Sequence, residues 1–336
     1  MYRYNHFIPQ NTAPKGTKRI GVYDTNGKKI MTIPLGGLTP PKSEKLYSFG
    51  IVSDIHLYPL APVAWEPEEK FDNALTHFEN VGCSFCVACG DLTNTGFYLR
   101  TVESDANTTY LDERQLTKYK EICDKHTISV YEIAGNHESY YGMPITNNLN
   151  KWNTFTGKGE LSYTVTQGND LFIFVGQPQG SIPMSDADLQ WLQETLETNR
   201  NKRCFIFVHP HISSGNPLGA YTSNNLFAEW GAKTTTFKNL LSHYGNAILF
   251  HGHSHFLFEC QEYDKTANYS QNDGFKSIHI PSLSRPCDIV DGVRTTQDSK
   301  SQCYVVDVYE DCIVLNGMDL INNKPIPLGT YKINTN

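Results

Sequence analysis

Five short polar motifs, each placed directly after a short apolar run, constrain the fold of this chain more than any other feature. The runs are rich in Val, Ile and Phe and end at Gly, Asp or His, which is typical of buried strands that stop at a turn. They occupy residues 49–52, 85–89, 128–134, 204–208 and 247–250. The motifs are Asp54-Ile55-His56, Gly90-Asp91-Leu92-Thr93-Asn94, Gly135-Asn136-His137-Glu138, His209-Pro210-His211 and Gly252-His253-Ser254-His255.

The position of these motifs predicts that they meet in space. In open α/β sheets, ligands bind beyond the carboxyl ends of the strands. Carboxylates, an amide and imidazoles from distant parts of the sequence would therefore converge at one edge of a sheet. Such groups are suitable ligands for divalent cations, and together they nearly complete the ligand shells of two ions. The alternative is that they are ordinary polar residues satisfied within the core.

In their order and spacing, the five motifs resemble the calcineurin-like metallophosphoesterase superfamily. That family shows Asp-x-His, Gly-Asp-x-x-(Asp/Asn), Gly-Asn-His-(Asp/Glu), a lone His and Gly-His-x-His, and all five blocks are present here in that order. The resemblance covers roughly residues 46–284. It implies an α/β (α+β) fold, a four-layer αββα sandwich with two mixed β-sheets and a dimetal site at the carboxyl ends of the strands.

The resemblance also implies a role for each motif residue. One metal would be held by Asp54, His56 and His255, and the other by Asn136, His209 and His253. Asp91 would bridge the two ions. His137 would lie beside the substrate as a catalytic residue and bind no metal.

The chemistry of phosphoester hydrolysis is consistent with these roles. Two cations neutralise the charge that repels a nucleophile, and they make a metal-bound hydroxide available near neutral pH. A leaving alkoxide needs a proton, which an imidazole such as His137 can donate. The ligand set suits Mn, Fe, Zn or Co.

At several positions this chain lacks residues that are typical of particular branches of the family, and these differences limit the class of substrate that we expect. Ser/Thr protein phosphatases carry Arg directly before the Gly-Asn-His-Glu block and shortly after the Gly-Asp block, where this chain has Ala134 and then Thr95 and Gly96. Purple acid phosphatases have Tyr, and nucleases often His, in place of Asn94. We therefore expect a small-molecule phosphodiesterase or phosphatase. The alternatives are a phosphomonoesterase such as a nucleotidase, or a binding or structural module that keeps the fold without turnover.

Three further residues are candidates for contacts with the substrate. Asn94 could bind the substrate or a metal ligand, or simply form a turn. His211 could touch phosphate, or it could support a ligand from behind. Arg285 could clamp an anion, for which its geometry is suited, or it could be a surface residue.

Residues 1–44 are predicted to be an accessory segment, followed by a phosphoesterase domain at residues 45–336. Residues 19–23 and 28–33 flank Asp24-Thr25-Asn26-Gly27, which predicts a β-hairpin because Asn-Gly favours left-handed turn positions. Residues 35–42 are predicted to be a Gly/Pro linker. The hairpin could attach the protein to an assembly, or it could add an edge to the core sheet.

Periodicity and capping predict the remaining elements. We expect helices at residues 68–81, 111–126, 185–196 and 234–243, and a hairpin formed by residues 161–166 and 171–175. Strands are also expected at residues 256–259, 275–280, 304–308 and 312–315.

Composition limits the partners and the compartment. A net charge of −7 disfavours stable nucleic-acid binding, which depends on Lys and Arg. No run approaches the length of a membrane span, and residues 1–12 lack the apolar core of a signal peptide. Nine scattered cysteines fit reduced thiols, so we expect a cytoplasmic protein. Cys83-x-x-Cys86-x-x-Cys89 resembles a metal-binding knuckle, but a strand would point neighbouring members of this series to opposite faces.

Overall fold

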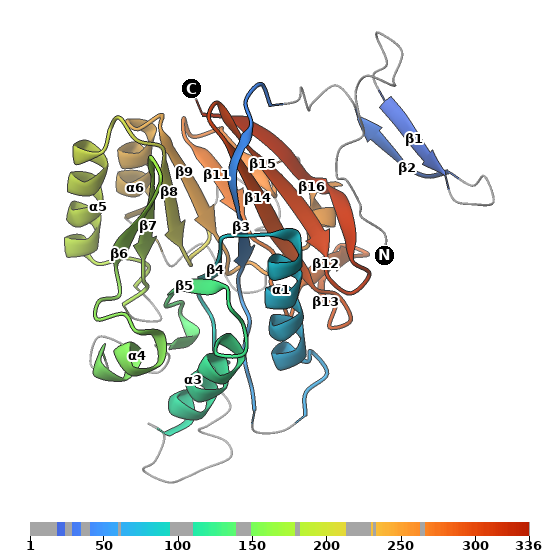
Figure 1. The fold of residues 1–336 in the computed structure, drawn as a ribbon, viewed down its shortest axis with the longest axis horizontal. Coiled ribbons are helices and arrows are strands. Elements are labelled where there is room, and N and C mark those ends of the chain that lie inside the picture. Colours follow the sequence, from blue (N-terminus) through green and yellow to red (C-terminus); the bar gives the residue numbers. More distant parts are fainter. Residues whose placement is uncertain are drawn as a thin grey trace.

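The computed structural model describes residues 19–23, 29–34, 41–59, 62–94, 110–138, 149–178, 182–212, 230, 233–262 and 266–335, with the backbone alone at 19–23, 29–34, 110–113 and 149–151. Two six-stranded mixed sheets form its centre (Figure 1). This architecture confirms the predicted αββα sandwich.

The first sheet has the strand order β16-β15-β14-β3-β4-β5. Its strands are β3 (Lys45–Val52), β4 (Phe85–Cys89), β5 (Ser129–Ile133), β14 (Gln302–Tyr309), β15 (Cys312–Asp319) and β16 (Lys324–Asn334). Strands β3, β4 and β5 are parallel, and β14 to β16 add an antiparallel half. The parallel half therefore brings the first three motifs to one edge.

The second sheet has the order β10-β11-β9-β8-β7-β6. It consists of β6 (Tyr163–Gln167), β7 (Asp170–Val175), β8 (Cys204–Val208), β9 (Ala247–His251), β10 (Tyr269–Ser270) and β11 (Lys276–His279). Strands β7, β8, β9 and β11 are parallel, and an antiparallel strand lies at each edge. The fourth and fifth motifs follow β8 and β9 at the same edge of this sheet.

An aromatic core joins the two sheets. Phe49 stacks on Phe85 at a centroid distance of 5.2 Å and meets Phe172 edge-on at 5.2 Å. Within β4, Cys89 belongs to this inter-sheet core, whereas Cys86 faces the helices outside the sheet. The strand interpretation of the cysteine series is thus confirmed, and all nine cysteines are free thiols.

Helices cover the outer faces of both sheets (Figure 1). The apolar sides of α1 (Pro67–Val81) and α3 (Tyr110–Cys123) pack on the first sheet, together with Trp152 of α4 (Leu149–Thr156). The second sheet is covered by α5 (Asp186–Thr198) and α6 (Lys233–Ser242). Ser185 caps α5 as expected, because its hydroxyl accepts the Asp188 N–H at 2.9 Å.

One predicted strand is wrong. Residues 256–259 contain a single bridge at Phe256 and then enter a 3-10 helix, η6 (Phe258–Glu262). Side chains replace a strand partner here, since the Phe258 N–H donates to Gln302 Oε1 at 2.9 Å and its carbonyl accepts from Asn268 Nδ2 at 2.8 Å. The structure also contains elements that we did not predict, namely α4, β10, β16 and the hairpin of β12 (Cys287–Val290) and β13 (Val293–Thr296).

The expected N-terminal hairpin is seen as an antiparallel pair, β1 (Arg19–Tyr23) and β2 (Lys29–Pro34), in a two-stranded sheet separate from the two large ones (Figure 1). Its turn and residues 35–40 of the expected linker lie outside the described residues. The domain boundary at residue 44 stays a prediction. Across the described ranges, no helix is long and apolar enough to cross a membrane.

Candidate metal centre

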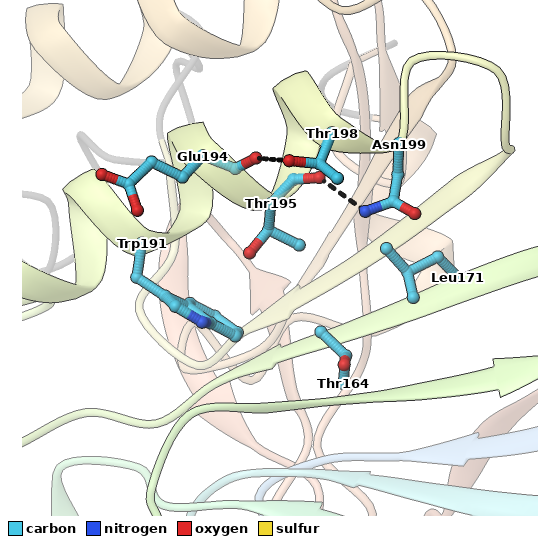
Figure 2. A pocket seen from close by; sticks show the side chains of 7 residues that line it. All are labelled: Thr164, Leu171, Trp191, Glu194, Thr195, Thr198 and Asn199. Atoms are coloured by element: carbon cyan, nitrogen blue, oxygen red, sulfur yellow. Dashed lines mark hydrogen bonds between the residues drawn. The ribbon is translucent and has the colours of Figure 1, made fainter.

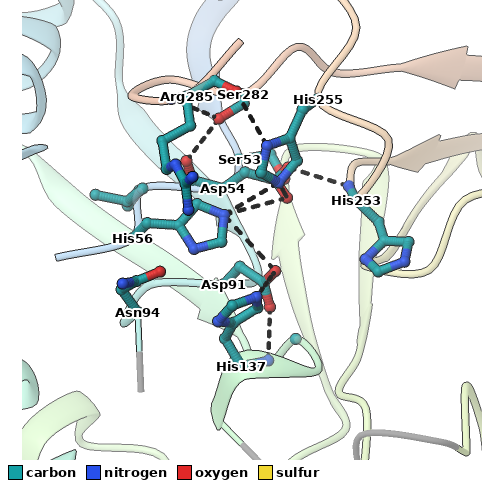
Figure 3. Close-up of polar contacts among 12 residues, drawn as sticks. Ser53, Asp54, His56, Asp91, Asn94, His137, His253, His255, Ser282 and Arg285 are labelled. Atoms are coloured by element: carbon teal, nitrogen blue, oxygen red, sulfur yellow. Dashed lines mark hydrogen bonds and ion pairs between the residues drawn. The ribbon is translucent and has the colours of Figure 1, made fainter. Parts of the chain in front are cut away.

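The five motifs meet because of where their strands end. Asp54 lies two residues beyond β3 and Asp91 two residues beyond β4, while His209 directly follows β8. The loops are joined by their backbones, since the N–H of Asp54 donates to the Gly90 carbonyl at 3.1 Å and that of His56 to the Asp91 carbonyl at 3.0 Å. The side chains of Asp54 and Asp91 consequently lie in one cluster with those of His56 and His255 (Figure 3).

Backbone strain is concentrated at these loops. Several candidate ligands have a positive φ, namely Asp54 (53°), His56 (52°), Asp91 (50°), His253 (69°) and His255 (63°). Each such non-glycine residue costs on the order of 1 kcal/mol or more, and such residues cluster at functional sites. Glycine permits the close approach of the loops, because a Cβ on Gly135 would lie 2.3 Å from Asp91 Oδ1. The conformation of the chain is thus specialised to bring these side chains together.

The first group of potential ligands comprises Asp54, His56, Asp91 and His255, with one ligand atom of each lying within 4.8 Å of the others. His255 Nε2 is 3.0 Å from Asp54 Oδ1 and 3.1 Å from His56 Nε2. His56 Nε2 is 3.9 Å from Asp91 Oδ2. Four ligand atoms so placed can surround one cation.

The second group comprises Asp91, His209 and His253. His209 Nε2 lies 3.1 Å from Asp91 Oδ2, the same oxygen that faces the first group. Asn136 is 1% exposed, and its Oδ1 makes no hydrogen bond to any described residue. Asp91 is the member shared by both groups, which is the position of a bridging carboxylate.

Hydrogen bonds on the far side of each ligand fix its orientation. His209 Nδ1 donates to the Cys89 carbonyl at 2.8 Å, and His255 Nδ1 to the Arg285 carbonyl at 3.0 Å, so both Nε2 atoms turn inward. Asp54 Oδ2 accepts from Ser53 Oγ at 2.6 Å and leaves Oδ1 for the centre. Such outer contacts are characteristic of metal-binding histidines and carboxylates.

The inward atoms form a donor set that fits two divalent cations. The buried oxygens Asp54 Oδ1 and Asp91 Oδ2 face ring nitrogens of His255 and His209 at 3.0 Å and 3.1 Å, and Asn136 Oδ1 is buried without a hydrogen bond to a described residue. Buried polar atoms of this kind are rare in folded proteins unless an ion, water or ligand satisfies them. Oxygen and imidazole nitrogen are the ligands preferred by Mn, Fe, Zn and Co.

Electrostatics also favour cations at this position. Burial opposes ionisation of Asp54, but the imidazoles of His255 and His209 hold the pKa of this carboxyl well below its ordinary value. Burial likewise disfavours charge on the two histidines, yet Asp91 and Asp54 raise the pKa of His209 to about 10, and Asp54 raises the pKa of His255 to about 9. The carboxylates thus require positive charge nearby, which protons or bound cations can supply.

Glu138 organises the centre, although its motif predicted no role for it. Its carboxylate accepts the N–H groups of Asp91 at 3.1 Å, Thr93 at 2.9 Å and Gly135 at 2.7 Å. It therefore ties the loop after β4 to the loop after β5. Its place in the Gly-Asn-His-Glu motif was the only sequence signal.

His137 lies at the open side of the centre. Its Nε2 is 3.8 Å from Asp91 Oδ2, and its ring meets that of His56 edge-on at a centroid distance of 4.5 Å. The His137 side chain is 19% exposed, compared with 1% for His56 and none for His209. Neither potential ligand group includes it. This is where a residue that contacts a substrate would lie.

Two of the three predicted substrate contacts lie close to the centre (Figure 3). Asn94 is buried, and its Nδ2 makes no hydrogen bond to a described residue. The guanidinium of Arg285 lies over the Trp65 ring at 4.7 Å, and its side chain extends beside His56. His211 is placed differently, since it groups with His251 and His279.

A separate pocket lies between α5 and the β6–β7 hairpin (Figure 2). It is lined by Thr164, Leu171, Trp191, Glu194, Thr195, Thr198 and Asn199. None of the predicted site residues lines this pocket, so we assign it no part in the metal centre.

Comparisons with known proteins identify the family and the fold. The family model of the calcineurin-like phosphoesterases matches residues 47–257. A search of curated proteins finds no significant match. A dimetal phosphatase from Danio rerio has a similar structure, with a TM-score of 0.59 and 13% identity, covering 87% of this chain and 100% of its own. GAP50, described as the anchor in the inner membrane complex of Plasmodium, gives a TM-score of 0.53 at 14% identity, covering 87% of this chain and 89% of its own. At these identities the structural likenesses show the fold alone.

Proposed function

The chain belongs to the calcineurin-like phosphoesterase family, and we propose that it hydrolyses a small-molecule phosphodiester or phosphomonoester with two divalent cations bound around Asp91. One observation carries the proposal. Asp91 belongs to both potential ligand groups, and its buried Oδ2 faces His56 Nε2 of one group at 3.9 Å and His209 Nε2 of the other at 3.1 Å. A carboxylate in that position is suited to bridge two ions.

Each ion would have its own ligands besides Asp91. Asp54, His56 and His255 would hold one, and Asn136, His209 and His253 the other. Bound cations neutralise the charge of a phosphoester and lower the pKa of a coordinated water. The ligand atoms would accept Mn, Fe, Zn or Co.

His137 would act as the proton donor to the leaving group. Burial lowers the pKa of this imidazole, Asp91 opposes the shift, and His255 reinforces it. An anionic phosphoester beside the ring would raise the pKa again, since an opposite charge favours the protonated form. Proton donation would therefore depend on a bound substrate.

Asn94 and Arg285 would bind and orient the substrate. The amide of Asn94 has a buried donor, Nδ2, without a hydrogen-bond partner in the described residues. Trp65 holds the guanidinium of Arg285 in place by stacking, and a fixed guanidinium is well suited to phosphate oxygens.

A module without turnover is the second candidate. It is favoured by the likeness to GAP50, which is described as an anchor, and residues 1–44 would supply the attachment. The likeness extends to the fold alone, whereas every ligand of the family pattern is present in this chain. We therefore favour the enzyme. Within the enzyme class, the alternative to a diesterase is a phosphomonoesterase such as a nucleotidase.

A panel of phosphoesters tests the proposal. Metal-free protein is reloaded separately with Mn, Fe, Zn or Co and assayed on alkyl and aryl phosphodiesters, phosphomonoesters and nucleotides. We expect turnover of at least one small phosphoester with at least one metal, abolished by Asp91→Asn. The matched control is Asp186→Asn, whose side chain is 91% exposed and lies on α5. Two bound metals without turnover of any member of the panel would favour the anchoring module.

A further inference from the structure

Three buried histidines outside the Asp91 centre lie together at the ends of neighbouring strands. His211 follows β8, His251 ends β9 and His279 ends β11. They are only 3%, 3% and 2% exposed. The ring centroids of His211 and His251 are 4.5 Å apart, and those of His211 and His279 are 5.7 Å apart. Each offers a ring nitrogen within 4.8 Å of the others. We call this group the three-histidine cluster.

The topology of the sheet produces this cluster. Strands β8, β9 and β11 are adjacent and parallel, and His251 is the direct register partner of His279. Phe250 and Ile278, one residue earlier, belong to the core between the sheets. Because side chains alternate along a strand, His251 and His279 point to the opposite, helix-covered face. The cluster is thus built on a different face of the sheet from the inter-sheet core.

Contacts around the cluster hold its rings in place. His251 Nε2 lies 3.0 Å from Ser277 Oγ, and His279 Nε2 lies 3.0 Å from the Phe256 carbonyl. The second ring nitrogen of His251, Nδ1, is buried and makes no hydrogen bond within the described ranges. A fixed imidazole with one satisfied and one unsatisfied nitrogen is typical of a metal ligand whose other nitrogen is bound by its surroundings.

From this arrangement we infer that His211, His251 and His279 bind a third metal ion, a zinc-type cation, separate from the Asp91 centre. Among the described residues, no carboxylate belongs to the ligand group that these three histidines form. Imidazole nitrogen suits Zn²⁺, whereas Mn²⁺ and Mg²⁺ prefer oxygen ligands. Three imidazoles plus one further ligand complete the tetrahedral shell that zinc adopts.

The position of the cluster indicates what the ion would do. It would join the ends of β8, β9 and β11, and His251 is only two residues from His253 and four from His255. The ion would therefore fix the loop that carries two ligands of the Asp91 centre. Its binding should stabilise the fold even when the Asp91 centre holds no metal, because it binds the folded state alone.

The test is the zinc content of protein freed of metal, reloaded with Zn²⁺ and separated from unbound ions. We expect three zinc ions per chain in the wild type and two in His251→Ala. The control is His243→Ala, an exposed histidine at the end of α6, which should retain three. Equal zinc content in His251→Ala and His243→Ala would overturn the proposal.

A second pair of proteins separates this site from the Asp91 centre. Asp54→Ala/Asp91→Ala removes both carboxylates of that centre and leaves the three-histidine cluster intact. We expect it to retain zinc, to melt at a higher temperature with Zn²⁺ than without, and to lose one zinc when His279→Gln is added. Glutamine keeps a donor for the Phe256 carbonyl. Absence of a zinc-dependent shift in melting temperature in the Asp54→Ala/Asp91→Ala protein would overturn the inference, even if the phosphoesterase proposal stood.

Discussion

His209 Nε2 lies 3.1 Å from Oδ2 of Asp91, and both side chains are buried at the junction of the two sheets. One residue follows β8 in the second sheet, and the other follows β4 in the first. The contact therefore exists only because the sandwich aligns the carboxyl ends of both sheets. It also places a shared carboxylate between two sets of potential ligands.

Asp91→Ala should lose both metals of the Asp91 centre and all measurable turnover, because the bridge contributes to both ions. His209→Ala should weaken mainly one site and leave a metal in the other. Metal content and kcat are measured on the same preparations, with Asp186→Ala as the control for an exposed aspartate. Two tightly bound metals and normal turnover in Asp91→Ala would show that the bridge is misassigned.

His137→Asn should retain both metals and lose turnover in proportion to the need of the leaving group for a proton. A general acid contributes roughly 10²–10⁴-fold, so an alkyl phosphoester should lose about that much. A nitrophenyl ester, whose leaving group departs unprotonated, should lose far less. The measurement is the rate of hydrolysis by the wild type and by His137→Asn for a series of esters whose leaving groups differ in pKa. Equal losses throughout the series would mean that His137 positions the phosphate and does not donate a proton.

Glu132→Gln should make the free energy of unfolding depend less on pH between pH 4.5 and 7. Burial raises the pKa of this carboxyl from 4.5 to about 7, with Tyr119 and Lys158 opposing the shift. Between these values the unfolded chain ionises while the folded chain stays protonated. The contribution of Glu132 to stability is therefore greatest below pH 4.5, and it falls as the pH rises to 7. At about 1.4 kcal/mol per pKa unit, the fall is about 3 kcal/mol.

Urea unfolding of the metal-free protein at several pH values measures this effect. Glu79→Gln is the control, because hydrogen bonds to His126 and Thr127 lower the pKa of Glu79 to about 2. The free energy of unfolding of Glu79→Gln should therefore still fall between pH 4.5 and 7, as it does in the wild type. An unchanged slope in Glu132→Gln would show that the buried carboxyl is ionised in the folded state.

A chain that begins at Lys45 should keep its catalysis if residues 1–44 are an attachment element. The described strands β1 and β2 pair only with each other, which is consistent with that role. The measurement is a comparison of kcat and melting temperature between the full chain and the chain that begins at Lys45. Failure of the shorter chain to fold would instead make the hairpin part of the core.

The sequence predicted the fold where strand and motif coincide. The runs at β4 and β8 are fully apolar and end at a motif, so both strands were predicted with their observed bounds. Strand β16 was missed because Pro325 and Pro327 disfavour a strand interior, and it lies at the edge of its sheet, where proline is tolerated. The β12–β13 hairpin carried an Asp291-Gly292 turn signal that we overlooked; both residues have positive φ.

The candidate ligands were predictable because each stands inside a local motif, and the structure brings the two carboxylates and the four histidines among them together. The three-histidine cluster, by contrast, was not predictable from the sequence. His251 and His279 are 28 residues apart in sequence, and only the register between β9 and β11 makes them neighbours. Sequence spacing does not reveal such a register.

Anomalous diffraction from crystals of the manganese-loaded protein would locate the two ions themselves. We expect two manganese peaks flanking Asp91 Oδ2, about 4 Å apart as in other two-metal sites. Asp54, His56 and His255 should surround one peak, and Asn136, His209 and His253 the other. A single peak, or two peaks that Asp91 does not join, would contradict this expectation.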